Sequence, residues 1–208
     1  EIYMGDWSSD VCSSDLITSV RRHLDALPPE VPEVAHLNSL VDAATVEEGD
    51  LRASLRLGLT AYSHFLEIEG RYAEALDVLR LASATWKDPV AAGDFLPFAL
   101  LAGRLHRLLS RWRAANTAYR AAMDAAQALG DRASELRAQL GRANVTRGEG
   151  NLPAALTATQ AVLKEADEQG YTELVGLAYL DLGAVLERMG RGAEALRAQF
   201  REIGRAHV

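Results

Sequence analysis

The residues whose type and spacing predict chemistry are arginines in the middle of the chain. Arg104 and Arg107 are three residues apart, and Asn144 and Arg147 repeat this spacing forty residues later. Guanidinium groups bind carboxylates and phosphates through paired hydrogen bonds, and an amide adds further donors. We therefore predict that these four residues, with Arg137 nearby, attract an anion such as a carboxylate-bearing peptide.

The carboxylates of this sequence suggest a second interpretation of the arginines, namely that they form ordinary ion pairs. They show no spacing typical of a catalytic pair. Glu135 and Glu149 are acidic neighbours with which the arginines could pair instead, in which case these arginines would be ordinary solvated side chains. We predict that Glu67, Glu74 and Glu187 lie on solvated helix faces. No Ser-His-Asp arrangement can be read from the spacing.

The histidines show no spacing that is typical of a metal site or of catalysis. No two of them share a predicted helix at ligand spacing; they are His23, His36, His64 and His106, apart from one near the C-terminus. His106 occupies a position that leucine holds in other parts of the chain. We expect a packed core histidine with one hydrogen bond. The sequence therefore predicts no enzyme, no cofactor and no metal site.

A repeat of forty residues determines where these side chains lie. Four similar segments begin at residues 70, 110, 150 and 190, and read GRYAEAL, SRWRAAN, GNLPAAL and GRGAEAL. Each has an alanine at the same position, namely Ala75, Ala115, Ala155 and Ala195. A small residue precedes each segment by seven positions, namely Ser63, Gly103, Ala143 and Gly183. The period does not drift along the chain, which indicates stacked units of one kind.

Each unit predicts two antiparallel helices that are joined by a tight turn. Apolar residues recur at three- and four-residue spacing before the turns; in the first and last units these are Leu55, Leu59, Tyr62, Leu66, Leu174, Leu177, Leu180 and Val185. Glycine at the turn accepts the left-handed backbone that ends a helix. The turn glycines are Gly70, Gly150 and Gly190, and Ser110 is a weaker substitute. The small residue of the first helix should face the alanine of the second, so that the axes approach to about 8 Å.

Residues at the helix starts predict caps. Asp131 or Ser134 is expected to cap one first helix, Thr172 another, and Asp94 a third. Pro97 would then fall in the first turn of its helix, where proline is tolerated.

The segments LAGRLHRLLSRWRAANTAYRAA (Leu101–Ala122) and LDLGAVLERMGRGAEAL (Leu180–Leu196) resemble the tetratricopeptide repeat (TPR) family. The resemblance covers residues 51–201 as four units, at about 51–90, 91–130, 131–170 and 171–201. It implies an all-α fold, an α-solenoid of antiparallel helix pairs in a right-handed superhelix, with the first helices lining a concave groove. The units exceed the usual 34 residues by about six. Asn116 also replaces a leucine found in the other units.

Residues 17–50 are predicted to form a divergent, earlier helical repeat. Ala35 keeps the forty-residue phase with Ala75. Pro28 and Pro29 fit the turn between its two helices or the first position of the second.

The two ends of the chain fit one DNA segment read in opposite directions. EIGRAHV (Glu202–Val208) can be written GAG ATC GGA AGA GCA CAC GTC, and the complementary strand translates as DVCSSDL (Asp10–Leu16). This DNA resembles a sequencing adapter, so we interpret residues 1–16 and 202–208 as adapter-derived and the chain as a fragment. These ends hold five acidic residues and one arginine. Without them the net charge falls from −7 to −3.

The remaining composition narrows the possible functions. Cys12 is the only cysteine, so residues 17–201 form no disulfide, cysteine-zinc site or catalytic thiolate. The mild acidity argues against a direct nucleic-acid surface. No run of about eighteen apolar residues predicts a membrane span. These features favour a cytoplasmic protein.

The TPR resemblance implies a non-catalytic protein–protein interaction module, or scaffold, that binds a peptide or partner protein in its concave groove. One alternative is the sensing or regulatory repeat arm of a larger bacterial transcription regulator or signalling ATPase. Another is small-ligand binding within the superhelix. The sequence leaves the oligomeric state open. Because the chain is interpreted as a fragment, Leu196 and Phe200 at the truncated end of the last unit are predicted to favour self-association, as an artefact of truncation.

Overall fold

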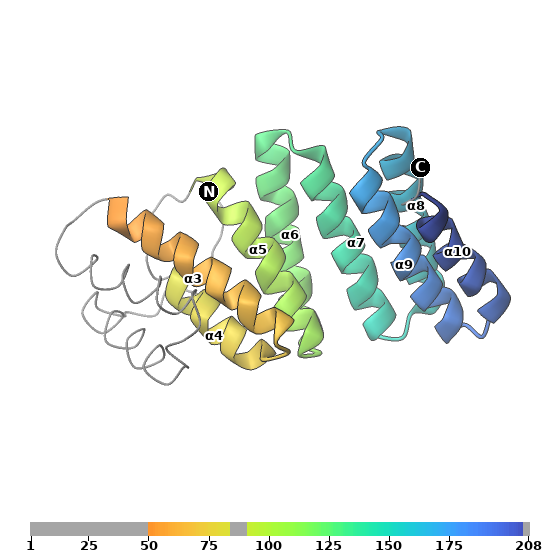
Figure 1. Cartoon of the computed structure of the whole chain (residues 1–208), viewed down its shortest axis with the longest axis horizontal. Helices are drawn as coiled ribbons and strands as arrows, with labels where there is room; N and C mark the ends of the chain where they lie inside the picture. The colour runs from red at the N-terminus through yellow and green to blue at the C-terminus, as the bar shows by residue number, and fades with distance from the viewer. Residues whose placement is uncertain (1–49, 84–90, 206–208) are drawn as a thin grey trace. The chain divides into compact units, whose positions relative to one another are not determined.

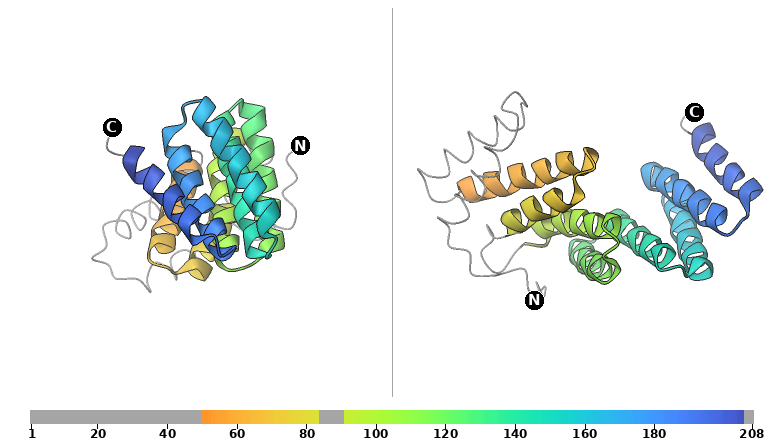
Figure 2. Two further views of the ribbon diagram at one scale, coloured as in Figure 1. Left: turned by 90° about the vertical axis from the view of Figure 1, so that its right-hand side faces the viewer. Right: turned by 90° about the horizontal axis from the view of Figure 1, so that it is seen from below.

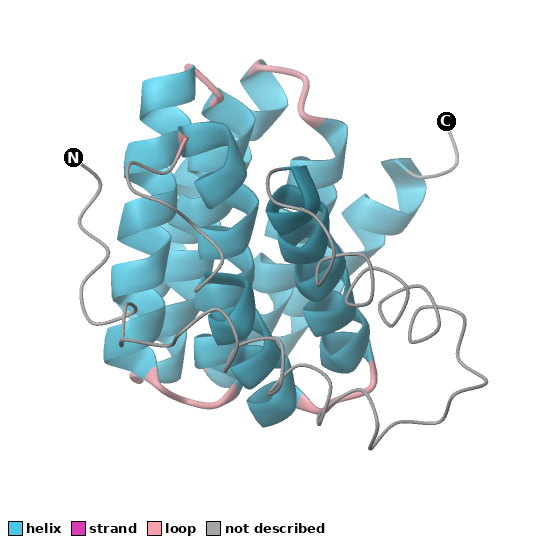
Figure 3. Ribbon diagram, turned by 90° about the vertical axis from the view of Figure 1, so that its left-hand side faces the viewer, coloured by secondary structure: helices cyan, strands magenta, loops and turns pink. Residues whose placement is uncertain are grey.

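The computed structural model describes residues 50–83 and 91–205, which form helices and short loops with no strand among them (Figures 1 and 3). This confirms the predicted all-α fold. The predicted adapter segment 1–16 and most of the predicted repeat 17–50 lie outside the described residues. Residues 202–205, which we assigned to the second adapter segment, continue the last helix.

The helices follow one another in pairs at the predicted forty-residue period. The first of two compact units, residues 1–91, contains α3 (Asp50–Ile68) and α4 (Tyr72–Ser83). The second unit, residues 92–208, contains α5 (Ala92–Leu108), α6 (Trp112–Leu129), α7 (Arg132–Gly148), α8 (Leu152–Glu168), α9 (Thr172–Arg188) and α10 (Gly192–Arg205). The first helices α5, α7 and α9 begin at residues 92, 132 and 172. The second helices α4, α6, α8 and α10 begin at residues 72, 112, 152 and 192.

In the second unit, adjacent helices pack in sequence order, and the first helices form an inner layer. α5 contacts α7, and α7 contacts α9, whereas the described parts of α6, α8 and α10 contact only first helices (Figure 2). Helices on the inner side of a curved stack approach each other more closely than those on its outer side. The second unit is therefore a helical stack in which α5, α7 and α9 present a common surface.

The turns inside the pairs adopt the left-handed backbone that the sequence predicts. Gly70, Gly150 and Gly190 have φ values of 76°, 91° and 75°, and Ser110 has a φ of 57°. The amide after the turn donates back to the helix, as from Arg111 to the carbonyl of His106 at 2.8 Å. Ser110 is thus strained relative to glycine, because a side chain is disfavoured in this conformation.

The cap predictions are partly wrong. The Asp131 side chain accepts a hydrogen bond from the Ser134 amide at 3.0 Å and caps α7, as predicted. Thr172 is instead the first residue of α9, after Tyr171 in the cap position. α5 begins at Ala92, so Asp94 lies in its first turn and not at its cap.

Pro97 also differs from its prediction, because it is the sixth residue of α5 and lies beyond the first turn. Its ring cannot donate the backbone hydrogen bond that an α-helix uses at this position. The residue is exposed. Water can therefore satisfy the carbonyl group that lacks this donor.

The small residues lie at the helix contacts, but their partners vary. The Ser63 hydroxyl donates to the Ala75 carbonyl at 2.7 Å, which confirms the predicted pairing in the first pair. A Cβ on Gly183 would approach the Ala195 carbonyl oxygen to 3.5 Å and Gln199 more closely. A Cβ on Gly103 would instead approach the ring of Tyr119 to 2.7 Å. The nearest neighbour of Gly103 is thus the Tyr119 ring, and Ala115, the predicted partner of Gly103, is buried.

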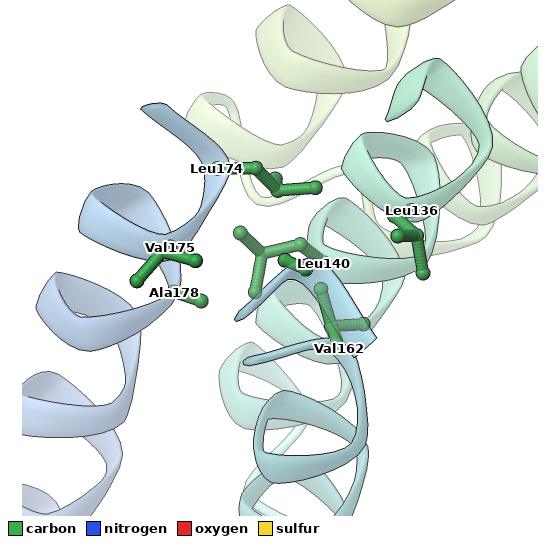
Figure 4. Close-up of a cluster of buried hydrophobic side chains, with 7 residues drawn as sticks. Leu136, Leu140, Val162, Leu174, Val175 and Ala178 are labelled. Atoms are coloured by element: carbon green, nitrogen blue, oxygen red, sulfur yellow. The ribbon is translucent and has the colours of Figure 1, made fainter. Parts of the chain in front are cut away.

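The core of the second unit consists of clusters at the junctions between helices. Leu140 and Val162 of α7 and α8 pack with Leu174, Val175 and Ala178 of α9 (Figure 4). A second cluster joins α9 and α10; its buried members are Leu182, Leu186, Ala195 and Ala198.

Leu177 and Leu180 belong to the apolar spacing that predicts this helix, but they lie outside the core. They are 39% and 46% exposed, whereas Leu174 and Val185 of the same helix are buried. A helix in a stack has neighbours on some sides only, so apolar spacing by itself does not show which side is covered.

Candidate functional site

Four of the five predicted anion-binding residues come together on the inner layer. Arg104 and Arg107 lie in the last two turns of α5, and Asn144 and Arg147 lie in the last two turns of α7. The group also contains Tyr119 of α6 and Asp181 of α9. We call these six residues the arginine cluster: Arg104, Arg107, Tyr119, Asn144, Arg147 and Asp181.

Tyr119 fixes the first side of the arginine cluster. Its buried ring lies against Gly103 of α5 and Gly141 of α7, where a Cβ on Gly141 would come within 2.4 Å of the ring. The Tyr119 hydroxyl is hydrogen-bonded to Arg107, and Arg104 and Asp181 lie within electrostatic range. Burial raises the pKa of Tyr119, and Arg107 partly opposes this rise. The tyrosine therefore stays a neutral phenol at neutral pH.

Asp181 joins α9 to the other side of the arginine cluster. The Asn144 amide nitrogen donates to the Asp181 carboxylate at 2.6 Å. Burial raises the pKa of Asp181, while the Asn144 hydrogen bond and the charges of Arg147 and Arg107 oppose the rise. Even a partly buried carboxylate needs such partners, because its transfer from water is costly.

Arg147 carries a positive charge in partly buried surroundings. Burial lowers the pKa of its guanidinium; Asp181 opposes this effect, and the charges of Arg107 and Arg188 add to it. Arg188 of α9 donates to the Arg147 carbonyl at 2.7 Å. Arg107 and Arg147 thus act on the Asp181 carboxylate, and the arginine cluster holds three arginines against this one carboxylate.

Arg137 is not part of the arginine cluster. Its guanidinium forms an ion pair with Glu173 of α9 at 2.8 Å, and both side chains are exposed. Arg137 thus fits the alternative interpretation, pairing with an acidic neighbour, although this neighbour is Glu173 and not Glu135 or Glu149. Glu135 accepts from Gln127 at 2.8 Å and pairs with Arg132. Glu149 is exposed.

Sequence reasoning missed Tyr119 and Asp181. Two glycines inside predicted helices, Gly103 and Gly141, were the available signal for an aromatic ring at close range. Contacts between α7 and α9 join residues 36, 37 and 41 positions apart. The forty-residue phase led to Ala184 as the counterpart of Asn144, whereas its partner Asp181 lies one helical turn earlier.

The remaining predicted positions have structural roles. His106 is buried, as predicted. Glu67 contradicts its prediction, because its side chain is only 10% exposed and pairs with the His64 Nδ1 at 3.1 Å. Asn116, which stands in place of a leucine, accepts a hydrogen bond from Arg142 of α7 at 2.9 Å. A polar residue there thus joins α6 to α7.

Among residues 50–83 and 91–205, no group of three or more His, Cys, Asp or Glu side chains could hold a metal ion. No described helix combines the length and apolar character that crossing a membrane requires.

Comparison with known proteins adds no relative. No protein-family model matches the chain, and no curated protein matches its sequence. The TPR resemblance therefore stays a prediction. The structure itself shows a repeat of paired helices that pack in sequence order.

Proposed function

We propose that this chain is a TPR-like interaction module that binds an acidic peptide, or an acidic segment of a partner protein, at the arginine cluster. The observation that carries the proposal is the convergence of Arg104, Arg107 and Arg147 on the inner layer of α5 and α7. The activity proposed is binding without catalysis or a cofactor. The regulatory-arm and small-ligand alternatives stay predictions.

Partial burial makes these arginines suitable for recognising carboxylates. A guanidinium that has already lost part of its water pays less additional desolvation when a ligand carboxylate replaces the remainder. A hydrogen bond to a charged group contributes about 1.5–3 kcal/mol. Three such bonds contribute about 4.5–9 kcal/mol, and only the upper end of this range reaches the roughly 8 kcal/mol that corresponds to 1 μM, so we expect a transient complex.

The surrounding helices hold the arginine cluster in place before binding. Tyr119 is wedged between two glycines, and Asn144 is fixed by Asp181. Side chains that are already ordered lose little entropy when a ligand arrives. The negative charge of Asp181 also repels a ligand carboxylate. A ligand is therefore expected to approach the arginines on α5 and at the end of α7, away from Asp181.

The experiment compares an acidic peptide with its amide analogue, in which glutamine and asparagine replace every glutamate and aspartate. Both are titrated against the protein by fluorescence anisotropy. We expect the acidic peptide to bind at least tenfold more tightly, and Arg104→Glu/Arg147→Glu to remove most of this difference. Raising the salt concentration should weaken the binding, because exposed charges are screened.

The matched control is Arg113→Glu/Arg137→Glu, which changes the net charge by the same amount. Arg113 lies exposed on α6, and Arg137 is paired with Glu173. This variant should retain most of the affinity. Undiminished binding by Arg104→Glu/Arg147→Glu, or equal losses in both variants, would show that the arginine cluster is not the binding site.

A further inference from the structure

Asp181 is the one acidic residue of the arginine cluster, and a neighbouring helix holds it there. Its Oδ2 accepts a hydrogen bond of 2.6 Å from the amide of Asn144, which is buried on α7. Arg147 lies three residues after Asn144 and therefore on the same side of α7. Asp181 itself is partly buried. The site for which we propose an anionic ligand thus already contains an anion of its own.

The polar and charged groups around Asp181 come from α5, α6, α7 and α9. They are Arg104 and Arg107 on α5, Tyr119 on α6, Asn144 and Arg147 on α7, and Arg188 on α9. Between about pH 4 and pH 8 the arginines stay protonated and the tyrosine stays a neutral phenol. Asp181 is therefore the member of the arginine cluster whose charge depends on pH in this range.

Protonation of Asp181 removes its charge without breaking its link to α7. A protonated carboxyl group keeps an oxygen that accepts a hydrogen bond, so Asn144 can still donate to it. Burial raises the pKa of Asp181, while the Asn144 hydrogen bond and the charges of Arg147 and Arg107 oppose this rise. The two arginines thus help to keep the carboxylate ionised, and a ligand that neutralises them favours its protonation.

We propose that anion binding at the arginine cluster is coupled to proton uptake by Asp181. An acidic ligand neutralises the charges of Arg107 and Arg147, and the Asp181 carboxylate then binds one proton from the solvent. This coupling rests on the function proposed above, because it acts at the same site. Asp181 is thus an internal competitor of the ligand, and its competition ends when it is protonated.

The coupling makes anion binding tighter at acidic pH. A ligand that raises the pKa of Asp181 must bind more tightly to the protonated form of the protein, by the same factor. A rise of one pKa unit corresponds to a difference in affinity of about tenfold. For a ligand whose own charge is constant, we therefore expect the affinity to increase as the pH falls through the pKa of Asp181.

The test uses a probe peptide of constant charge, because ligand carboxylates would titrate in the same range as Asp181. Cysteic acid replaces each glutamate and aspartate of the acidic peptide, since its sulfonate group stays ionised. Binding to the full chain is measured by fluorescence anisotropy over the pH range in which circular dichroism shows an unchanged fold. We expect the affinity to increase roughly tenfold between about pH 8 and pH 4.5.

Isothermal titration calorimetry measures the proton uptake directly. Titrations in two buffers with different ionisation enthalpies give the number of protons that are bound with each ligand. We expect the natural sequence to take up protons at acidic pH, approaching about one per ligand, and Asp181→Asn to take up none. A purely structural role of Asp181 would change the affinity in this variant but not the number of protons.

Two variants assign the coupling to Asp181. Asp181→Asn should bind the probe at pH 8 about as tightly as the natural sequence does at acidic pH, and its affinity should not depend on pH. The matched control is Asp124→Asn, which removes the same charge from an exposed position on α6 and should keep the natural pH dependence. Both variants retain the histidines, including His106 of α5. A pH dependence that histidines cause would therefore persist in Asp181→Asn.

The results separate the coupling from the proposed function. Suppose that the natural sequence binds the probe, that Arg104→Glu/Arg147→Glu does not, and that Asp181→Asn keeps the pH dependence and the proton uptake. The arginine cluster is then the binding site, and the coupling to Asp181 is wrong. Constant affinity of the natural sequence at every pH would also overturn the coupling. Absence of binding in both the natural sequence and Asp181→Asn would overturn the proposed function and the coupling together.

Discussion

Tyr119 is the residue on which the packing of three helices converges. It projects from α6, and its ring occupies the space that glycine leaves on both α5 and α7. Its hydroxyl then reaches Arg107. One side chain thus combines a packing role with the positioning of an arginine, so its glycine partners matter to the candidate site as well as to stability.

We predict that Gly141→Ala destabilises the protein by about 1–3 kcal/mol, the usual cost of overpacking a tight contact. The added Cβ would lie 2.4 Å from two ring atoms of Tyr119, so the ring or a helix must move. Urea denaturation followed by circular dichroism measures the loss.

The matched control is Gly93→Ala near the start of α5, where an added Cβ meets no atom within 4 Å. This change should be neutral or slightly stabilising, because alanine favours a helix more than glycine does. Equal stability of Gly141→Ala and the natural sequence would contradict the close fit of Tyr119.

At the scale of elements, the turn between two helices is the feature repeated most regularly. Three of the four turns within pairs use glycine at the left-handed position, and the α5–α6 turn uses Ser110. The turns between successive pairs in the second unit also place glycine there, at Gly130 and Gly170. Ser110 is the only described residue other than glycine with a positive φ.

We expect Ser110→Gly to stabilise the protein by about 0.5–1 kcal/mol. Relief of left-handed strain is worth about 1–2 kcal/mol, and the greater freedom of glycine in the unfolded chain returns part of it. The reciprocal control, Gly150→Ser in the α7–α8 turn, should destabilise by a similar amount. Thermal unfolding of both variants measures the two changes. A loss of stability in Ser110→Gly would contradict the strain at this turn.

Arginine–glutamate ion pairs recur at equivalent places in the repeat, but one arginine reaches a different helix. Arg71–Glu74 and Arg191–Glu194 are bidentate pairs at the same place in the first and last pairs, at the start of the second helix. Arg132 of α7 instead reaches Glu165 of α8, with Nε–Oε1 and Nη2–Oε2 distances of 2.6 and 2.8 Å. The Arg132–Glu165 pair therefore connects two helices, whereas the other two pairs each join residues three positions apart at the start of a single helix.

At the scale of the whole molecule, carboxylates with a lowered pKa and the one with a raised pKa have opposite effects on stability. Hydrogen bonds lower the pKa of Asp131, Glu135 and Glu165. These carboxylates stabilise the fold at pH values above their ordinary pKa values. This stabilisation is lost as the pH falls through their lowered pKa values. Burial raises the pKa of Asp181, so its ionisation destabilises the fold as the pH rises through the raised value.

We therefore predict that Asp181→Asn raises the melting temperature at pH 7. Asparagine can still accept the hydrogen bond from Asn144 and carries no charge to bury. The difference from the natural sequence should disappear below the ordinary aspartate pKa, about 3.9, where Asp181 is protonated in both folded and unfolded states.

Thermal unfolding between pH 3 and pH 8 measures this pH dependence. Glu165→Gln is the control of opposite sign, because it removes a carboxylate whose pKa is lowered by Arg132. It should lower stability at pH 7 and change it little at pH 3. A pH-independent effect of Asp181→Asn would contradict the raised pKa.

The sequence by itself determined the all-α fold, the order and period of the helices and the left-handed turns, and it narrowed the cap of α7 to Asp131 or Ser134. Each of these depends on residues within a few positions of one another, or on a phase that is constant along the chain. The grouping of Arg104, Arg107, Asn144 and Arg147 followed from the same phase.

Only the tertiary structure decided which equivalent positions are covered and by what. It paired Asn144 with Asp181, placed Tyr119 over Gly103 and Gly141, moved Arg137 to Glu173, and left Leu177 and Leu180 exposed. The physical reason is that each of these depends on the offset between neighbouring helices and on the presence of a neighbour. A helical pattern specifies which residues share a face, but it does not specify what lies opposite that face.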